Sequence, residues 1–263
     1  MKELLLRTLT GVSLIVLVTG SILLGPLSFL AIVLVVYLLG VRELFGLLQK
    51  RDLAIRWIRA IPGALLIIIA YAVFQYGLSM LWFLLPPALW LITALRGGIT
   101  LSGTLAFLWL AIPLSSFLVL GWVKNEPGFH YRMPLALIAL VWINDTFAYL
   151  SGSLLGKHKM TPVLSPGKTW EGFFGGGICT ILSAYVISGY NFHFDMPTWL
   201  IIGVVVWIFG VVGDFSESAW KRYYSIKDSG TVMQGHGGFL DRLDSFVYSV
   251  PIISLIAYMI LKT

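Results

Sequence analysis

The sequence lacks most of what a water-soluble domain of its size requires. Only 11% of its 263 residues are Asp, Glu, Lys or Arg, whereas 58% are hydrophobic and the mean hydropathy is +0.90. Because polar side chains this sparse cannot cover a soluble domain, the lipid bilayer is the expected solvent. The single cysteine, Cys179, excludes an intramolecular disulfide and is interpreted as a packing residue. The sequence also lacks internal repeats and low-complexity tracts.

Charged residues are missing from long stretches of the chain. Six runs contain no Asp, Glu, Lys or Arg, and a further candidate span, 133–155, is interrupted only by Asp145. A spanning helix needs roughly 20 apolar residues, so the first two runs can each hold two helices, divided at Gly25-Pro26 and at 75–77. The sequence therefore predicts an all-α, polytopic integral membrane protein with about nine transmembrane helices. The spans are expected near 8–24, 27–41, 60–76, 79–95, 104–123, 133–152, 173–190, 197–213 and 245–261.

Positive charge is distributed unevenly between the two ends of these spans. Fifteen of the 18 Lys and Arg residues fall on the N-terminal side, and only Lys124, Arg132 and Lys262 fall on the other. The positive-inside rule then predicts a multi-pass protein of the cell (inner) membrane, with the N-terminus cytoplasmic and the C-terminus outside. The first apolar run is too long for a signal peptide and lacks a small-residue cleavage site, which indicates a retained span. The net charge of +6 needs no nucleic-acid partner.

The two halves of the chain differ in their polar content. Residues 1–130 are expected to form an N-terminal membrane bundle of about five spans, with 42–59 as an amphipathic segment at the membrane interface. Residues 131–263 are expected to form a C-terminal catalytic region of about four spans, joined to the first half in one integrated domain. Three polar clusters lie in this second half, on or near the cytoplasmic side.

The first cluster is WINDTFAYLSG, residues 142–152, which places Asn144 and Asp145 in an otherwise apolar span. A carboxylate within the membrane is costly, so it usually faces a partner or a wet cavity and marks a functional site. The alternative is a structural polar contact between helices.

The second cluster is SPGKTWEGFFGGG, residues 165–177. Ser165-Pro166-Gly167 predicts a turn, and Thr169 or Ser165 can cap the helix that follows. A lysine beside a helix N-terminus, here Lys168, suits an anionic phosphate, with Glu171 in the same turn. The spacing is not that of a P-loop. An ordinary loop before a glycine-rich packing face is the alternative.

The third cluster is GDFSESAWKRYYSIKDSGTVMQGHGGFLDRLDS, residues 213–245. A helix that continues past Asp214 would carry Ser218, Lys221 and Arg222 on one face, although Lys221 could instead pair with Glu217.

The end of this cluster combines glycines with carboxylates. The glycine-rich stretch 235–238 permits close approach of the backbone to a phosphate. Asp241 and Asp244, three residues apart, would present two hard oxygen ligands suited to Mg²⁺ that carries a nucleotide phosphate. The alternatives are a simple turn, a charge pair at a helix start, and a loop histidine at His236 that only makes hydrogen bonds.

The third cluster resembles the signature of the phosphatidate cytidylyltransferases (CDP-diacylglycerol synthases). That signature reads Ser, two residues, Lys-Arg, four residues, Lys-Asp, then a spacer to His-Gly-Gly and Asp-Arg-x-Asp. SPGKTWEG and DTFAYLSG resemble two further segments of the family, whereas the first 130 residues match only as apolar spans. Gln234 stands where the family usually has proline, and Trp220 replaces a smaller aliphatic residue or Phe. The matching residues are Ser218, Lys221, Arg222, Lys227, Asp228, Gly230, His236, Gly237, Gly238, Asp241, Arg242 and Asp244.

The resemblance implies the reaction CTP + phosphatidic acid → CDP-diacylglycerol + pyrophosphate, a step of phospholipid biosynthesis at the cytoplasmic membrane face. It implies Mg²⁺ as cofactor, leaves room for a monovalent cation such as K⁺ and for a homodimer, and involves no nucleic acid. Catalytic roles then fall to Lys221, Arg222, Lys227, Asp228, His236 and Arg242. Substrate binding falls to Asp145, Ser165, Lys168, Thr169, Glu171, Ser218, Gly235, Gly237 and Gly238, and metal binding to Asp214, Asp241 and Asp244.

Three other functions would need different features. A CTP-dependent polyprenol or phytol kinase would use a lipid alcohol as the nucleophile and attack the γ-phosphate. A membrane transporter would have a site at the bilayer midplane, discontinuous helices and internally repeated halves. A non-catalytic scaffold would not need three acidic clusters on one side.

Overall fold

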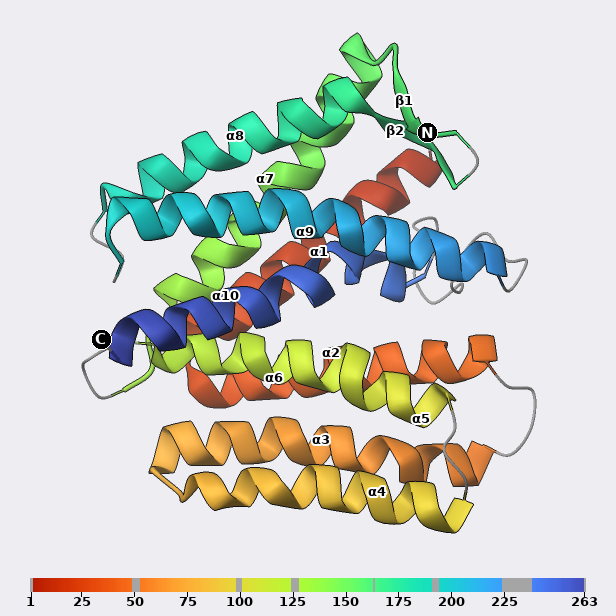
Figure 1. Cartoon of the computed structure of the whole chain (residues 1–263), viewed down its shortest axis with the longest axis vertical. Helices are drawn as coiled ribbons and strands as arrows, with labels where there is room; N and C mark the ends of the chain where they lie inside the picture. The colour runs from red at the N-terminus through yellow and green to blue at the C-terminus, as the bar shows by residue number, and fades with distance from the viewer. Residues whose placement is uncertain are drawn as a thin grey trace. The chain divides into compact units, whose positions relative to one another are not determined.

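The computed structural model of the chain describes residues 2–48, 53–97, 101–123, 128–162, 164–190, 194–223 and 238–262. Among these residues, six helices are long and apolar enough to cross a membrane, and three shorter apolar helices accompany them. These nine segments correspond one to one to the nine expected spans, which confirms the all-α, polytopic class (Figure 1). The described residues divide into two compact units, one formed by 1–131 and 228–242 and the other by 132–227 and 243–263.

The first unit contains the helices of the N-terminal half. A 3₁₀ turn (Met80–Leu84) precedes α4, a π-helical turn (Ala106–Ala111) joins α5 to α6, and further 3₁₀ turns lie at Leu120–Trp122 and at Leu240–Arg242 (η4). The helices are α1 (Lys2–Leu24), α2 (Pro26–Leu48), α3 (Leu53–Tyr76), α4 (Leu85–Gly97), α5 (Leu101–Leu105) and α6 (Ile112–Val119).

Glycines end the first helices where the sequence predicted a break. Gly25, with φ of 126°, separates α1 from α2, and Gly77, with φ of 67°, follows the last residue of α3. Such positive φ values are unfavourable for residues that carry a Cβ atom, so glycine is the residue that fits both positions.

Helix α2 forms the core of the first unit through one stripe of side chains. Phe29, Val33, Tyr37 and Val41 recur every four residues and are at most 2% exposed. This spacing places them on one face of the helix. The Phe29 ring meets Phe117 of α6 edge to face, with ring centroids 5.1 Å apart.

The described parts of the expected interfacial segment at 42–59 belong to two helices. Residues 42–48 continue α2 to Leu48, and α3 already begins at Leu53. Arg42 lies in α2 and Arg59 in α3, in continuity with the apolar parts of these helices. The position of this segment at the membrane interface stays a prediction, and residues 49–52 lie outside the described residues.

The second unit is a bundle of four helices with a short hairpin. Helix α7 packs against α8, α8 against α9, and α9 against α10 (Figure 1). The hairpin joins α7 to α8. The elements are α7 (Arg132–Leu155), β1 (Lys159–Thr161), β2 (Ser165–Thr169), α8 (Trp170–Ser188), α9 (Met196–Tyr223) and α10 (Asp244–Lys262).

Glycines let these helices approach one another closely. A Cβ atom on Gly176 of α8 would lie 2.9 Å from the Ala148 Cβ of α7, and one on Gly213 of α9 would lie 2.1 Å from the Asp244 backbone oxygen. Membrane helices use small residues in this way because close packing holds them together in lipid. The glycine-rich face after residue 171 is thus a packing face for α7.

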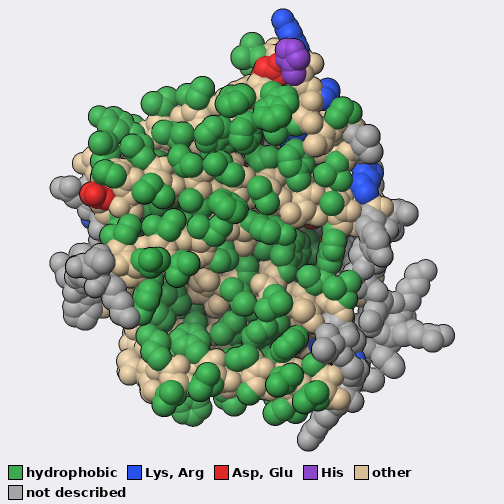
Figure 2. Space-filling view, in the orientation of Figure 1, with side chains coloured by type: hydrophobic (Ala, Val, Ile, Leu, Met, Phe, Trp, Pro, Cys, Tyr) green, Lys and Arg blue, Asp and Glu red, His purple; other side chains and the backbone are tan. Residues whose placement is uncertain are grey.

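Many exposed side chains of the described residues are large and apolar. Figure 2 shows hydrophobic side chains over nearly all of the displayed face, and a cluster of Lys, His and acidic side chains at its upper edge, where Figure 1 places the hairpin. Large apolar side chains such as Leu24, Leu154 and Leu182 are more than half exposed. An exposed apolar surface of this kind is suited to contact with lipid tails.

Candidate active site

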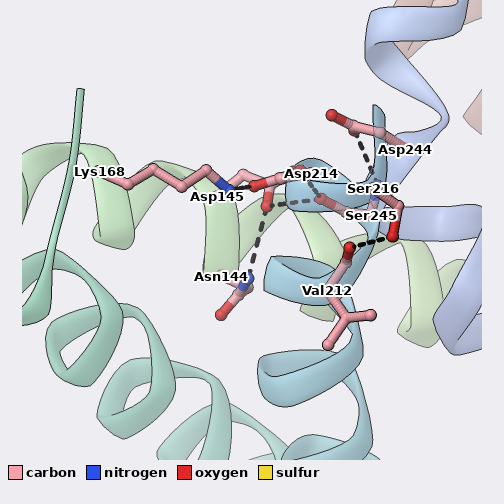
Figure 3. Close-up of polar contacts among 8 residues, drawn as sticks. All are labelled: Asn144, Asp145, Lys168, Val212, Asp214, Ser216, Asp244 and Ser245. Atoms are coloured by element: carbon pink, nitrogen blue, oxygen red, sulfur yellow. Dashed lines mark hydrogen bonds and ion pairs between the residues drawn. The ribbon is translucent and has the colours of Figure 1, made fainter. Parts of the chain in front are cut away.

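The candidate site is built in the second unit, where α7, α9, α10 and the hairpin bring polar side chains together (Figure 3). Helix α7 contributes Asp145. Its neighbour Asn144 is 3% exposed, and the Asn144 Nδ2 donates to Asp145 Oδ1 at 3.4 Å. The Thr180 hydroxyl of α8, fully buried, lies 3.3 Å from Asn144 Oδ1. The neighbouring helix thus supports the asparagine beside this carboxylate.

The hairpin places Lys168 next to these carboxylates. Strand β2 pairs antiparallel with β1, so Lys168 extends from an ordered strand. Thr169 then caps α8, because its side chain accepts the Gly172 N–H at 3.1 Å, as predicted from the sequence. The Lys168 ammonium forms an ion pair with Asp214 of α9 and lies 5.1 Å from the centroid of the Phe215 ring.

Helix α10 contributes a bridging hydroxyl. The Ser245 Oγ donates to Asp214 Oδ1 at 2.8 Å and lies 3.4 Å from Asp145 Oδ1. Ser245 is 4% exposed, and its own backbone N–H donates to Asp244 Oδ1 at 2.7 Å. One serine hydroxyl therefore lies between carboxylates from α7 and α9 and donates to the nearer one, Asp214.

A cavity of about 580 Å³ opens beside these groups. Asn144, Asp145, Lys168, Thr169 and Asp214 line it, with small residues from α7 and α8 on its walls. A cleft of this size with a few convergent polar groups is the usual form of a small-molecule site.

The carboxylates around the cavity stabilise the charged form of the Lys168 ammonium. Burial lowers the pKa of the Lys168 ammonium to about 8, and the negative charges of Asp244 and Asp145 oppose that effect. Because the pKa stays above 7, the side chain carries its charge at neutral pH. A charged ammonium at the wall of a partly apolar cavity is well placed to neutralise a phosphate.

The structure corrects two predictions about the loop before α8. Ser165-Pro166-Gly167 is extended backbone within β2, not a turn, and Ser165 pairs with Thr161 rather than capping α8. Proline suits an edge strand because the missing N–H faces away from the partner strand. Glu171 binds the hairpin, since it accepts the His158 backbone N–H at 3.2 Å and lies 2.7 Å from His158 Nδ1.

Helix α9 continues past Asp214 to Tyr223, so the predicted helical face is confirmed. Asp214 lies inside this helix rather than at its end. Lys221 forms an ion pair with Glu217, 4% exposed, at 3.5 Å, which is the structural pairing weighed above. Ser218 is half-buried and Arg222 is exposed on the last turn.

The other described residues of the prediction divide between the two units. Gly238, Asp241 and Arg242 belong to the first unit, and Asp241 lies in η4, whereas Asp244 begins α10, so this pair does not share a helix face. The other predicted residues, Lys227, Asp228, Gly235, His236 and Gly237, lie outside the described residues.

The carboxylates fit a magnesium ion that is completed by a substrate. Within the described ranges, no three or more His, Cys, Asp or Glu side chains gather as a metal site. Mg²⁺, however, is usually held by one or two carboxylates together with substrate phosphates. Asp145 and Asp214, which share the Ser245 hydroxyl, supply two hard oxygen donors of this kind.

Sequence reasoning missed Ser245, the residue that joins two of the predicted carboxylates. A serine near the start of a helix usually indicates a cap, so neither its type nor its position predicted a contact with the carboxylates. Asn144 was visible as a polar residue in an apolar span, but its contacts with α8 depend on helix packing.

The chain is similar in sequence to known cytidylyltransferases. The model of the cytidylyltransferase family matches residues 5–260. The phosphatidate cytidylyltransferase of Staphylococcus aureus (strain COL) is 43% identical over 134 residues, which cover 50% of each chain. Those of Staphylococcus epidermidis (strain ATCC 12228 / FDA PCI 1200) and Staphylococcus haemolyticus (strain JCSC1435) are 44% identical over 126 residues and 41% over 136 residues. The first of these two alignments covers 48% of each chain. The second covers 51% of this chain and 52% of the relative. The chain therefore spans about half the length of the curated relatives it matches.

Proposed function

The chain belongs to the cytidylyltransferase family, and from this premise we propose that it is a phosphatidate cytidylyltransferase. It would convert CTP and phosphatidic acid into CDP-diacylglycerol and pyrophosphate. The observation that carries the proposal is the Lys168 ammonium held among carboxylates of three helices beside a cavity of about 580 Å³. The relatives that carry this enzyme name support the choice of substrates.

The proposed reaction is an in-line transfer of a nucleotidyl group. A phosphate oxygen of phosphatidate attacks the α-phosphorus of CTP, a new P–O bond forms, and the α–β anhydride bond breaks to release pyrophosphate. Because the attacking oxygen is already anionic, the site needs no strongly shifted general base. Positioning and charge neutralisation are the demands that remain.

The residues of the cavity match these demands. Lys168 would contact a phosphate and stabilise the negative charge that develops on the leaving group. Asp145 and Asp214 would hold Mg²⁺, which when bound would neutralise the nucleotide phosphates. Ser245 would keep the two carboxylates at a fixed separation. Asp241 and Asp244 remain predicted metal ligands, and K⁺ and a homodimer remain predictions.

The function is tested with purified protein in detergent or proteoliposomes. We expect Mg²⁺-dependent conversion of labelled phosphatidate into CDP-diacylglycerol, with release of one pyrophosphate for each lipid. Release of CDP together with a phosphorylated lipid alcohol would show a lipid kinase instead. Binding of CTP without turnover, under conditions where a relative is active, would contradict the proposal.

We further propose that the hairpin faces the cytoplasm, with the N-terminus on the same side and the C-terminus outside, because positive charge gathers on that side. Two exposed positions test this orientation in a Cys179→Ala background: Lys157→Cys at the hairpin and Tyr190→Cys after α8. In intact cells, a membrane-impermeant maleimide should label only Tyr190→Cys, and Lys157→Cys should react only after permeabilisation. The reverse pattern would show that the span count is wrong by one.

A further inference from the structure

The N-terminal half contains one buried carboxylate for which the signature motifs give no role. Glu43 lies near the end of α2 and is only 5% exposed, in a unit whose buried side chains are mostly apolar. A buried carboxylate is unfavourable unless hydrogen bonds satisfy its oxygens. Its partners therefore indicate what it does.

Glu43 binds a segment from the far end of the chain. The backbone N–H of Leu240 donates to Glu43 Oε2 at 2.9 Å. One turn earlier on α2, the Leu240 side chain lies beside Gly40, since a Cβ atom there would be in ordinary contact with Leu240 Cδ2, at 3.5 Å. Helix α2 thus lies against both the backbone and the side chain of Leu240.

Leu240 is the centre of a short turn, residues 238–242, that is ordered at two further points. The Gly238 N–H donates to Asp241 Oδ2 at 2.9 Å, and the Arg242 N–H donates to the Phe239 oxygen at 3.1 Å. Phe239 and Leu240 are 5% and 2% exposed, whereas Arg242 is exposed. The turn therefore buries its apolar residues and leaves polar signature residues at the surface of the unit.

We propose that Glu43 is a positioning residue for this turn: its carboxylate holds the Leu240 amide and so fixes where Asp241 and Arg242 stand. The inference rests on the proposed function and on the family resemblance, which assigns Asp241 to metal binding and Arg242 to catalysis. It gives the N-terminal half a part in catalysis beyond anchoring in lipid. Glu43 itself acts through the turn and need not touch a substrate.

The test compares Glu43→Ala with Glu43→Gln. Alanine removes the acceptor, whereas glutamine retains a side-chain oxygen that can accept the same N–H. Without an acceptor, amide exchange in a peptide that covers 238–242 should become roughly ten- to a hundredfold faster, because a buried N–H loses its partner. We expect the kcat of Glu43→Ala to fall at least about tenfold, while Glu43→Gln stays near wild type in both exchange and turnover.

Val33→Ala is the matched control, because Val33 is 2% exposed on the same helix, ten residues before Glu43. It should lower the thermal unfolding midpoint without a selective change in exchange at 238–242 or in kcat. Unchanged exchange in Glu43→Ala would overturn the inference. The inference would also be overturned if Glu43→Ala and Val33→Ala lost the same fraction of kcat at the same loss of Tm. A Glu43→Gln variant that is as impaired as Glu43→Ala would overturn it as well.

Failure of the proposed function would look different. If the wild-type protein did not convert phosphatidate with CTP, the reaction would be wrong, yet the exchange measurements would still show whether Glu43 holds the turn. If the wild type is active and the exchange is unaffected by Glu43→Ala, only the positioning role is wrong.

Discussion

Asp214→Asn is expected to abolish turnover at ordinary Mg²⁺ concentrations while the protein remains folded. Asparagine keeps the shape of the side chain but removes the charge that would bind the metal ion and pair with Lys168. Loss of one charged metal ligand should cost at least about a hundredfold in activity at fixed Mg²⁺. The measurement is a titration of turnover against Mg²⁺ for the wild type and the variant, with the thermal unfolding midpoint of each.

Asp195→Asn provides a control on the same helix. Asp195 precedes α9 and accepts the Thr198 N–H at 3.2 Å, about 28 Å along the helix from Asp214. Its substitution should change stability little, because asparagine caps helices about as well as aspartate, and should leave the Mg²⁺ dependence unchanged. If Asp214→Asn lowers only stability, and its Mg²⁺ curve matches that of the wild type, Asp214 is a structural partner of Lys168 and not a metal ligand.

Lys168→Met is expected to reduce kcat by about 10²–10³-fold, the loss typical of removing one group that stabilises developing charge. Methionine is close to lysine in length and fills the same space beside the Phe215 ring, so the main change is the loss of the ammonium. Lys168→Arg keeps a positive charge but has a planar, forked head, and should retain more activity than Lys168→Met. Initial rates at varied CTP and phosphatidate would separate kcat from KM for each variant.

Lys157→Met is the matched control for this experiment, since Lys157 is an exposed lysine beside the same hairpin. It should behave like the wild type. A Lys168→Met enzyme whose kcat equals that of Lys157→Met would show that Lys168 serves only to compensate the charge of Asp214. The thermal unfolding midpoint of Lys168→Met should then fall with no loss of turnover.

The helices of this protein could be predicted from local features of the chain. Runs with little or no charge indicated nine spans, and the described part of the chain has nine apolar helical segments at those places. Gly25 and Gly77 marked two of the boundaries, because positive φ is a property of the backbone at that residue. The same reasoning failed at Pro166, where an extended strand takes the place of a turn.

The candidate site could be predicted only as a set of residue types on one side of the membrane. Asp145, Lys168 and Asp214 were all identified from the sequence, yet no spacing in the chain shows that they line one cavity. Their meeting depends on how closely α7, α8, α9 and α10 pack, which glycines such as Gly213 permit.

Composition and short motifs thus determined that the protein lies in a lipid bilayer, which fold class it has and to which family it belongs. Each of these can be inferred from residues that are close together in sequence. Tertiary structure alone decided which polar groups meet. Ser245 joins Asp145 to Asp214 across three helices, and Glu43 reaches Leu240 from the opposite half of the chain. A hydrogen bond between distant segments depends on how whole helices pack. The sequence around a serine or a glutamate does not indicate which distant residue it will contact.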